Sequence, residues 1–122
     1  KEKAERLGIR DAVIFYGTCR QVEKLYWVMD VFAFPSRFEG LGIAAIEAQA
    51  AGLPVLASEY LPAEAKITEA VKTVSLSLNP SVWAESILKA EAIQREKGIE
   101  IMKASGFHIY DCAERVRAEW MK

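Results

Sequence analysis

Two glutamates, Glu39 and Glu47, flank a glycine pair in the run FPSRFEGLGIAAIEAQAAG, residues 34–52. The glycines, Gly40 and Gly42, come directly before small apolar residues that favour a helix, and the first amides of a helix have no intrahelical acceptor. Amides at a helix N-terminus suit a phosphate or diphosphate, because they donate hydrogen bonds and the helix dipole adds positive charge there. A tight turn between a strand and a helix would use the same glycines, so both interpretations stay open at this point.

The second acid of the pair, Glu47, requires a partner. A helical wheel places it with Ile43, Ile46 and Ala50 on the stripe expected to face a sheet, where an unpaired carboxylate is strongly disfavoured. The partner is either a basic side chain, in a purely structural pair, or a ligand with two neighbouring hydroxyls, which an ionised carboxylate can accept. Glu39 is likewise either a solvated acid near a helix N-terminus or part of the same site.

The surrounding sequence alternates between strand and helix patterns. Short β-branched or aromatic runs predict strands, and amphipathic spacing, glycine stops and a cap at Ser81 predict helices. The predicted strands cover residues 13–16, 31–34, 53–57 and 71–78, and the predicted helices cover residues 1–7, 21–29, 41–51, 81–97 and 109–121. Residues 59–68 show no pattern that favours one structure.

This alternation predicts an α/β fold class. Strands that alternate with helices at such spacing form a parallel sheet with right-handed crossovers and helices on both faces, which is a doubly wound, Rossmann-like sheet. Ligands of such sheets bind beyond the carboxyl ends of the strands. The loop from Pro35 to Gly42 follows a predicted strand and is therefore the expected wall of the site.

Composition narrows the classes of partner. The chain has 122 residues, 52% of them hydrophobic, which suffices for one domain with a buried core. Sixteen basic and seventeen acidic side chains nearly cancel, so neither nucleic acid nor an anionic membrane surface is favoured. Cys19 and Cys112 lack metal-ligand spacing and indicate buried thiols in a reducing compartment. The sequence shows no pattern of a signal peptide or a membrane span.

The run FPSRFEGLGIAAIEAQAAGLPVLAS, residues 34–58, resembles the signature of the retaining nucleotide-sugar glycosyltransferases of family 4, with two glutamates separated by seven residues. The runs VIFYG and MDVFAFPS stand where that family has its neighbouring strands. The resemblance is looser beyond Ser58, where residues 61–88 are similar to members that build capsular or extracellular polysaccharide. It implies that residues 1–122 form a single partial domain, the donor-binding C-terminal half of a GT-B fold, with the acceptor domain and the first elements of this half upstream.

The resemblance also implies roles for the residues of the motif. Glu47 would bind the ribose hydroxyls of the donor, and Glu39 would bind the donor sugar and stabilise an oxocarbenium-like transition state. Four amides would hold the diphosphate and sugar, those of Gly40, Leu41, Gly42 and Ile43. The implied reaction is sugar transfer with retention by front-face attack, in which the leaving diphosphate helps to deprotonate the acceptor. It needs no essential metal and no other cofactor.

One departure from the family bears on activity. The family's diphosphate-binding Arg and Lys would lie upstream of Lys1, so we expect this chain alone to be inactive. Arg37 is expected to be solvated, His108 to lie outside the chemistry, and the tryptophans to be packing residues, namely Trp27, Trp83 and Trp120.

The expected partners are a nucleotide-sugar donor, with UDP-sugar as the first choice, and a saccharide or lipid-linked acceptor in surface polysaccharide synthesis. The expected location is the bacterial cytoplasm, with the parent enzyme peripheral to the inner face of the membrane. Two alternatives remain. One is a non-catalytic module that holds a nucleotide or another phosphorylated ligand, with Glu47 only structurally paired. The other is a nucleotide-sugar epimerase, which shares the two-domain architecture but not this glutamate pair.

Overall fold

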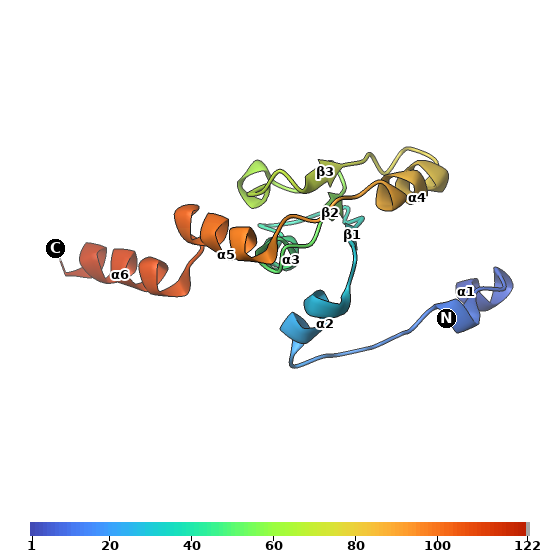
Figure 1. The fold of residues 1–122 in the computed structure, drawn as a ribbon, viewed down its shortest axis with the longest axis horizontal. Coiled ribbons are helices and arrows are strands. Elements are labelled where there is room, and N and C mark those ends of the chain that lie inside the picture. Colours follow the sequence, from blue (N-terminus) through green and yellow to red (C-terminus); the bar gives the residue numbers. More distant parts are fainter. Residues whose placement is uncertain (122) are drawn as a thin grey trace.

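The fold is built on a short parallel sheet, as a computed structural model of residues 1–121 shows (Figure 1). The strands are β1 (Phe32–Phe34), β2 (Val55–Ala57) and β3 (Val71–Thr73), which lie in the order β1-β2-β3. Both neighbouring pairs are parallel. The predicted α/β class with a parallel sheet is therefore confirmed, and it is consistent with the Rossmann-like C-terminal domain of a GT-B fold.

The helices alternate with these strands along the chain. Over the described residues they are α1 (Glu2–Arg6), α2 (Val22–Val28), α3 (Ile43–Ala50), α4 (Pro80–Leu88), α5 (Arg95–Ala104) and α6 (Ile109–Trp120), with short 3-10 helices η1 (Arg10–Ala12) and η2 (Ala63–Ala65). Helix α3 connects β1 to β2, and Gly52, two residues after its last residue, has the φ of +79° expected of a left-handed stop.

The core lies between α3 and the sheet. The alanines Ala45 and Ala48 of α3 are fully buried against Val55 and Ala57 of β2, because small side chains allow a helix to approach a sheet closely. Tyr26 of α2 and Met102 of α5, with Leu61 and Ala65 near η2, complete this cluster. The α3 side of the sheet is therefore its well-packed face.

The opposite face of β2 carries Leu56, which is 1% exposed. A small cavity beside Leu56 is lined by Lys72, Ala90 and Glu91, so the segment between α4 and α5 covers this face. Figure 1 shows that segment running past the sheet between the two helices. This face is covered only at the central strand, since Ala33 of β1 and Lys72 of β3, the register partners of Leu56, are exposed.

The strand predicted for residues 13–16 is wrong. Residues 13–19 have no regular secondary structure, and Ile14 and Tyr16 are 86% and 62% exposed. A strand needs a hydrogen-bonding neighbour, and among the described residues β1 pairs only with β2. Phe15 instead has the Lys1 ammonium and the Arg10 guanidinium over its ring, 5.8 Å and 5.6 Å from its centroid. The segment is an extended link between η1 and α2 (Figure 1).

The single helix predicted for residues 81–97 is also wrong. Helix α4 begins at Pro80 and ends at Leu88. Its N-cap is Asn79, whose Oδ1 accepts a hydrogen bond from the amide of Ser81 at 3.0 Å. Helix resumes in α5 and runs through Gly98. A Cβ at Gly98 would lie 2.8 Å from the carbonyl oxygen of Gln49, so α5 is placed by close packing of its backbone on the end of α3. A straight continuation of α4 would not provide that contact.

Candidate functional site

Hydrogen bonds from Ser58 hold the start of the loop that follows β1 at the carboxyl edge of the sheet. Ser58, the residue after β2, is fully buried, and its amide donates a hydrogen bond to the carbonyl oxygen of Phe34 at 3.1 Å. Its hydroxyl donates to the carbonyl oxygen of Ser36. The exits of two neighbouring strands are therefore tied together just before the loop reaches Glu39.

The two glycines of the loop differ in what the fold demands of them. Gly42 is buried with φ of +78°, and a Cβ there would lie 2.7 Å from Cδ1 of Leu61. Gly40 is exposed, and a Cβ there would meet nothing within 4 Å. The fold thus requires a glycine at 42, as the tight-turn interpretation holds, whereas the packing around Gly40 would admit a side chain.

Gly42 also forms the N-cap of α3. Its carbonyl oxygen accepts from the amides of Ala45 at 2.9 Å and Ile46 at 3.2 Å, which are the first hydrogen bonds of the helix. The amides of Ile43 and Ala44 come earlier, and within residues 1–121 no acceptor pairs with them. These amides, at the positive end of the helix dipole, are the donors that an anion needs.

The face of α3 that the helical wheel turned toward the sheet is right for Ile46 and Ala50, which pack in the core, and wrong for Ile43 and Glu47. Ile43 is 63% exposed and Glu47 is also exposed, whereas the buried residues are Ala45, Ile46, Ala48 and Gln49. Glu47 therefore points away from the sheet rather than toward it. A carboxylate on this face keeps part of its hydration and can reach a ligand.

A side chain that the sequence reasoning overlooked holds this rotation. Gln49 is 0% exposed; its Nε2 donates to the carbonyl oxygen of Ala65 at 2.7 Å, and its Oε1 accepts from the amides of Ile67 at 3.0 Å and Thr68 at 2.9 Å. Because a buried amide must find partners, this face of α3 must point toward the backbone of residues 65–68. In the sequence, the one sign of this role is a single glutamine in a run of alanines.

Glu47 has a partner that is not a basic residue. The hydroxyl of Tyr26 lies 3.2 Å from Oε2 of Glu47 and 3.3 Å from the carbonyl oxygen of Ala44, and it can donate its one proton to either. Burial, and then the charge and hydrogen bond of Glu47, raise the pKa of Tyr26 to about 12. The phenol therefore remains a protonated donor at neutral pH.

Glu47 also lines a groove between α2, α3 and α5. This groove, about 410 Å³ in volume, has as its lining Val22, Glu23, Tyr26, Trp27, Glu47, Ala50, Ala51, Arg95, Glu96 and Ile99. Arg95 ties two of its walls together, because its Nη2 donates to the carbonyl oxygen of Trp27 at 2.8 Å and its guanidinium lies 5.0 Å from the Trp27 ring centroid. We call this cavity the Glu47 groove.

The other members of the motif lie in the loop at the carboxyl edge. Glu39 is half-buried, next to Phe38, which is 87% exposed. Glu39 is not part of the lining of the Glu47 groove. Gly40, Leu41, Gly42 and Ile43 follow it into α3, and Glu47 comes one helical turn, about 6 Å of rise, after Ile43. The roles assigned to these residues stay predictions.

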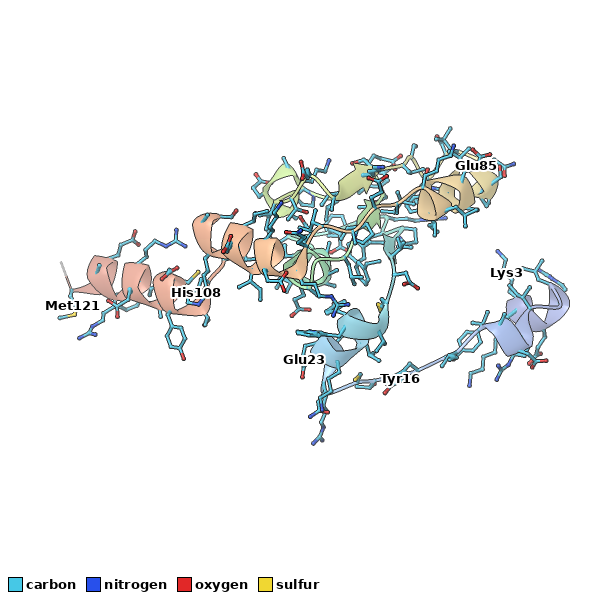
Figure 2. All side chains as sticks on the ribbon, viewed as in Figure 1. Lys3, Tyr16, Glu23, Glu85, His108 and Met121 are labelled. Carbon is cyan, nitrogen blue, oxygen red and sulfur yellow. The ribbon has the colours of Figure 1, made fainter. Side chains whose placement is uncertain are left out.

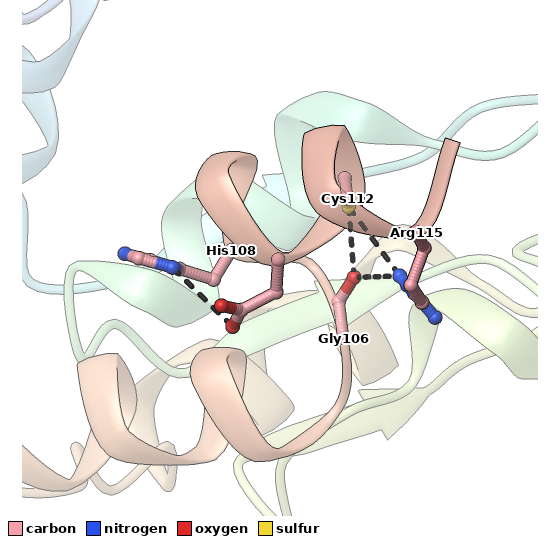
Figure 3. Close-up of polar contacts among 5 residues, drawn as sticks. Gly106, His108, Cys112 and Arg115 are labelled. Atoms are coloured by element: carbon pink, nitrogen blue, oxygen red, sulfur yellow. Dashed lines mark hydrogen bonds and ion pairs between the residues drawn. The ribbon is translucent and has the colours of Figure 1, made fainter. Parts of the chain in front are cut away.

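The remaining polar side chains lie apart from this loop. Figure 3 shows His108 and Cys112 at the start of α6, where His108 Nδ1 lies 3.3 Å from Oδ2 of Asp111. The carbonyl oxygen of Gly106 accepts from Cys112 Sγ at 3.0 Å and from Arg115 Nη2 at 2.7 Å. These contacts join α6 to the preceding turn, and they do not involve the glutamate pair.

Two expectations about side-chain burial are wrong. Trp27 and Trp120 are 60% and 86% exposed, because α2 and α6 have neighbours on only part of their surfaces. Cys19 and Cys112 are half-buried rather than buried. In the part of the chain that the structure describes, no cluster of three His, Cys, Asp or Glu side chains is arranged to hold a metal ion, and no helix is long and apolar enough to cross a bilayer.

The fold and the loop together define an α/β domain of the kind that forms the C-terminal half of GT-B glycosyltransferases. The family model of glycosyl transferases group 1 matches residues 1–104. Because this match covers most of the chain, the protein belongs to the glycosyl transferases group 1 family.

Similarity to named proteins supports this membership. The putative glycosyltransferase EpsF of Bacillus subtilis (strain 168) is 35% identical over 119 residues, which cover 97% of this chain and 31% of that protein. A D-inositol 3-phosphate glycosyltransferase of Corynebacterium urealyticum is 34% identical over 90 residues, 71% of this chain and 21% of that protein. The Vi polysaccharide biosynthesis protein VipC/TviE of Salmonella typhi is 43% identical over 60 residues, 48% of this chain and 10% of that protein. The chain thus spans a third or less of these relatives.

Proposed function

We propose that this chain is the donor-binding part of a retaining glycosyltransferase. The parent enzyme moves a sugar from a nucleotide-diphosphate sugar, with UDP-sugar as the first candidate, to a saccharide or lipid-linked acceptor in surface polysaccharide synthesis. The observation that carries the proposal is the arrangement around α3: its N-terminus is capped by Gly42, and Glu47 stands one turn further along, exposed beside a groove.

The N-terminus of α3 suits the diphosphate. The amides of Ile43 and Ala44 have no protein acceptor among the described residues, and the helix dipole favours a negative charge beside them. The packing around Gly40 does not require a glycine, so the absence of a side chain there is explained by a ligand that approaches the backbone. These observations support binding of the diphosphate at Gly40, Leu41, Gly42 and Ile43.

The environment of Glu47 suits a ribose. Its Oε2 faces the hydroxyl of Tyr26 at 3.2 Å, which leaves Oε1 and the second lone pair of Oε2 to accept from a vicinal diol. The phenol also restrains the orientation of the carboxylate. The Glu47 groove, at about 410 Å³, falls within the range of about 300–1,000 Å³ that is typical of small-molecule sites. We assign contact with the sugar to Glu39, in the loop before Gly40.

One observation favours the second candidate, a nucleotide-binding module without catalysis. Tyr26 already supplies Glu47 with a hydrogen bond, so the glutamate is partly satisfied without a ligand. The relatives named above include glycosyltransferases and a polysaccharide biosynthesis protein, which favours the transferase over both the module and the epimerase.

The test is calorimetric titration of the 122-residue chain with UDP, uridine and UDP-glucose. We expect weak binding of UDP, because residues 38–47, which would hold the diphosphate and ribose, include no basic side chain. Glu47→Gln should weaken UDP binding by about tenfold or more, since a hydrogen bond to a charged group contributes roughly 1.5–3 kcal/mol. Uridine should be affected by this variant as much as UDP is, because both carry the ribose.

Glu64→Gln is the matched control, since Glu64 is an exposed acid of η2 outside the Glu47 groove. It should leave the affinity for UDP unchanged. Equal affinity of the wild-type chain and Glu47→Gln for uridine would mean that Glu47 does not bind the ribose. The proposal would also fail if UDP bound no more tightly than uridine, because the α3 amides would then contribute nothing.

A further inference from the structure

A second cavity, of about 560 Å³, opens beside the same loop. Its walls come from three parts of the chain: Pro35 and Arg37 after β1, the segment 76–83 that leads into α4, and Lys3 of α1. Figure 2 labels Lys3 on α1, which lies at the same end of the molecule as α4 with its Glu85. We call it the Arg37 cavity.

The two cavities lie on different parts of the chain. Pro35 and Arg37 line the Arg37 cavity and Glu47 lines the Glu47 groove, and the two linings have no residue in common. The loop with Glu39 and Gly40 lies between Arg37 and Glu47 in the sequence.

The charges in the Arg37 cavity are all positive. Lys3 and Arg37 are exposed cations, no Asp or Glu is among the lining residues, and neither cation forms an ion pair within residues 1–121. An acid does lie close by, because Glu59 accepts hydrogen bonds from the hydroxyl of Ser75 at 2.5 Å and from the amide of Leu76 at 2.9 Å. Both of its oxygens are engaged there, and those hydrogen bonds lower the pKa of Glu59.

The rest of the lining is apolar. It consists of Leu76, Leu78, Pro80 and Trp83. The Nε1 of Trp83 donates a hydrogen bond to the carbonyl oxygen of Ser75 at 3.2 Å. Because the one polar atom of the indole is satisfied by the backbone, the ring offers the cavity an apolar surface. The hydrogen bonds of Glu59 with Ser75 and Leu76 also restrain this apolar wall.

We propose that the Arg37 cavity binds a phosphate-bearing amphiphile. Its phosphate would contact Arg37 and Lys3, and its apolar chain or ring would lie against Leu76, Leu78 and Trp83. Arg37 is the better phosphate ligand of the two cations, because a guanidinium can donate two parallel hydrogen bonds. This binding proposal does not depend on the proposed function.

The experiment follows the indole N–H signal of Trp83 in ¹H–¹⁵N correlation spectra of the full chain, assigned with Trp83→Phe. The probes are n-octyl phosphate below its micelle concentration, n-octyl β-glucoside and glucose 1-phosphate. We expect n-octyl phosphate to bind more tightly than either other probe, since it alone carries both the anion and the apolar chain. If glucose 1-phosphate bound as tightly, the site would be one for a phosphorylated sugar and the amphiphile would be ruled out.

The variants are Arg37→Met and the double variant Lys3→Met with Arg37→Met, and the control is Lys66→Met, an exposed lysine outside the cavity. The double variant should weaken n-octyl phosphate binding by about tenfold or more, because charge-assisted contacts to phosphate are the strong ones. Lys66→Met should not change it. Undiminished binding in the double variant, or an octyl glucoside affinity equal to that of octyl phosphate, overturns the proposal.

The two proposals fail separately. Loss of UDP binding in Glu47→Gln with no n-octyl phosphate binding in the wild-type chain supports the donor site and refutes the Arg37 cavity. The reverse pattern, with n-octyl phosphate binding that depends on Arg37 and UDP binding that ignores Glu47, keeps the cavity and refutes the donor site.

Discussion

Replacement of Gln49 by leucine should destabilise this domain strongly. Gln49 is fully buried and accepts hydrogen bonds from the amides of Ile67 at 3.0 Å and Thr68 at 2.9 Å. A leucine of similar length fills the space but accepts nothing. Each amide left without a partner costs about 1–3 kcal/mol, so the two together should lower the free energy of unfolding by about 2–6 kcal/mol. Whole domains have only about 5–15 kcal/mol, which makes this loss large.

The assay is urea denaturation followed by far-UV circular dichroism. Gln21→Leu is the control, because Gln21 is exposed at the N-cap of α2 and its side chain makes no capping hydrogen bond. It should change the free energy of unfolding by less than about 0.5 kcal/mol, as is usual for surface substitutions. The molecules of Gln49→Leu that remain folded should also bind UDP more weakly, since the rotation of α3 that exposes Glu47 loses its anchor. A loss of less than about 1 kcal/mol in Gln49→Leu would refute the role given to this side chain.

Three further predictions concern the loop and the glutamate pair. Gly42→Ala should destabilise the fold, because position 42 combines φ of +78° with a Cβ contact of 2.7 Å to Leu61. Gly40→Ala should leave thermal stability unchanged but weaken UDP binding. Equal melting temperatures of the two variants would contradict this. Because the pKa of Tyr26 is raised to about 12, the contribution of the phenol to folding stability is complete below pH 10 and is lost as the pH rises toward about 12. Between pH 10 and 12 the wild type should therefore lose more free energy of unfolding than Tyr26→Phe, as measured by denaturation at a series of pH values. In a full-length parent enzyme, Glu47→Gln should mainly raise the KM for the donor and Glu39→Gln should mainly lower kcat, because in the proposed function only Glu39 would face developing charge. The same kinetic change in both variants would remove the distinction.

The local features of the site followed from short stretches of sequence. The glycine pair, the helix after it and the strands on either side were all predicted, and the structure confirms β1, α3 and β2 with ends shifted by one or two residues. Such features depend on neighbours in the chain: Gly42 takes φ of +78° because no other residue does so cheaply, and Gly52 ends α3 for the same reason. The family signature lies in this same local pattern.

Tertiary contacts decided the features that the sequence reasoning missed. The direction of Glu47 depends on the rotation of α3, which is set by Gln49 and the backbone near Thr68, 19 positions away. A wheel that counts apolar residues could not find it, because in a run of alanines every face is nearly equally apolar.

Tertiary contacts also decided that residues 13–16 do not form a strand. Their composition favours a strand, but a strand exists only where another strand accepts its hydrogen bonds, and β1 pairs only with β2 among the described residues. The break between α4 and α5 likewise depends on the fit of Gly98 to the end of α3. The sequence alone therefore determined the fold class, the glycine-capped helix and the identity of the glutamate pair. The tertiary structure decided which side chains are buried, which way Glu47 points and which residues line the cavities, because these depend on contacts between residues far apart in the chain.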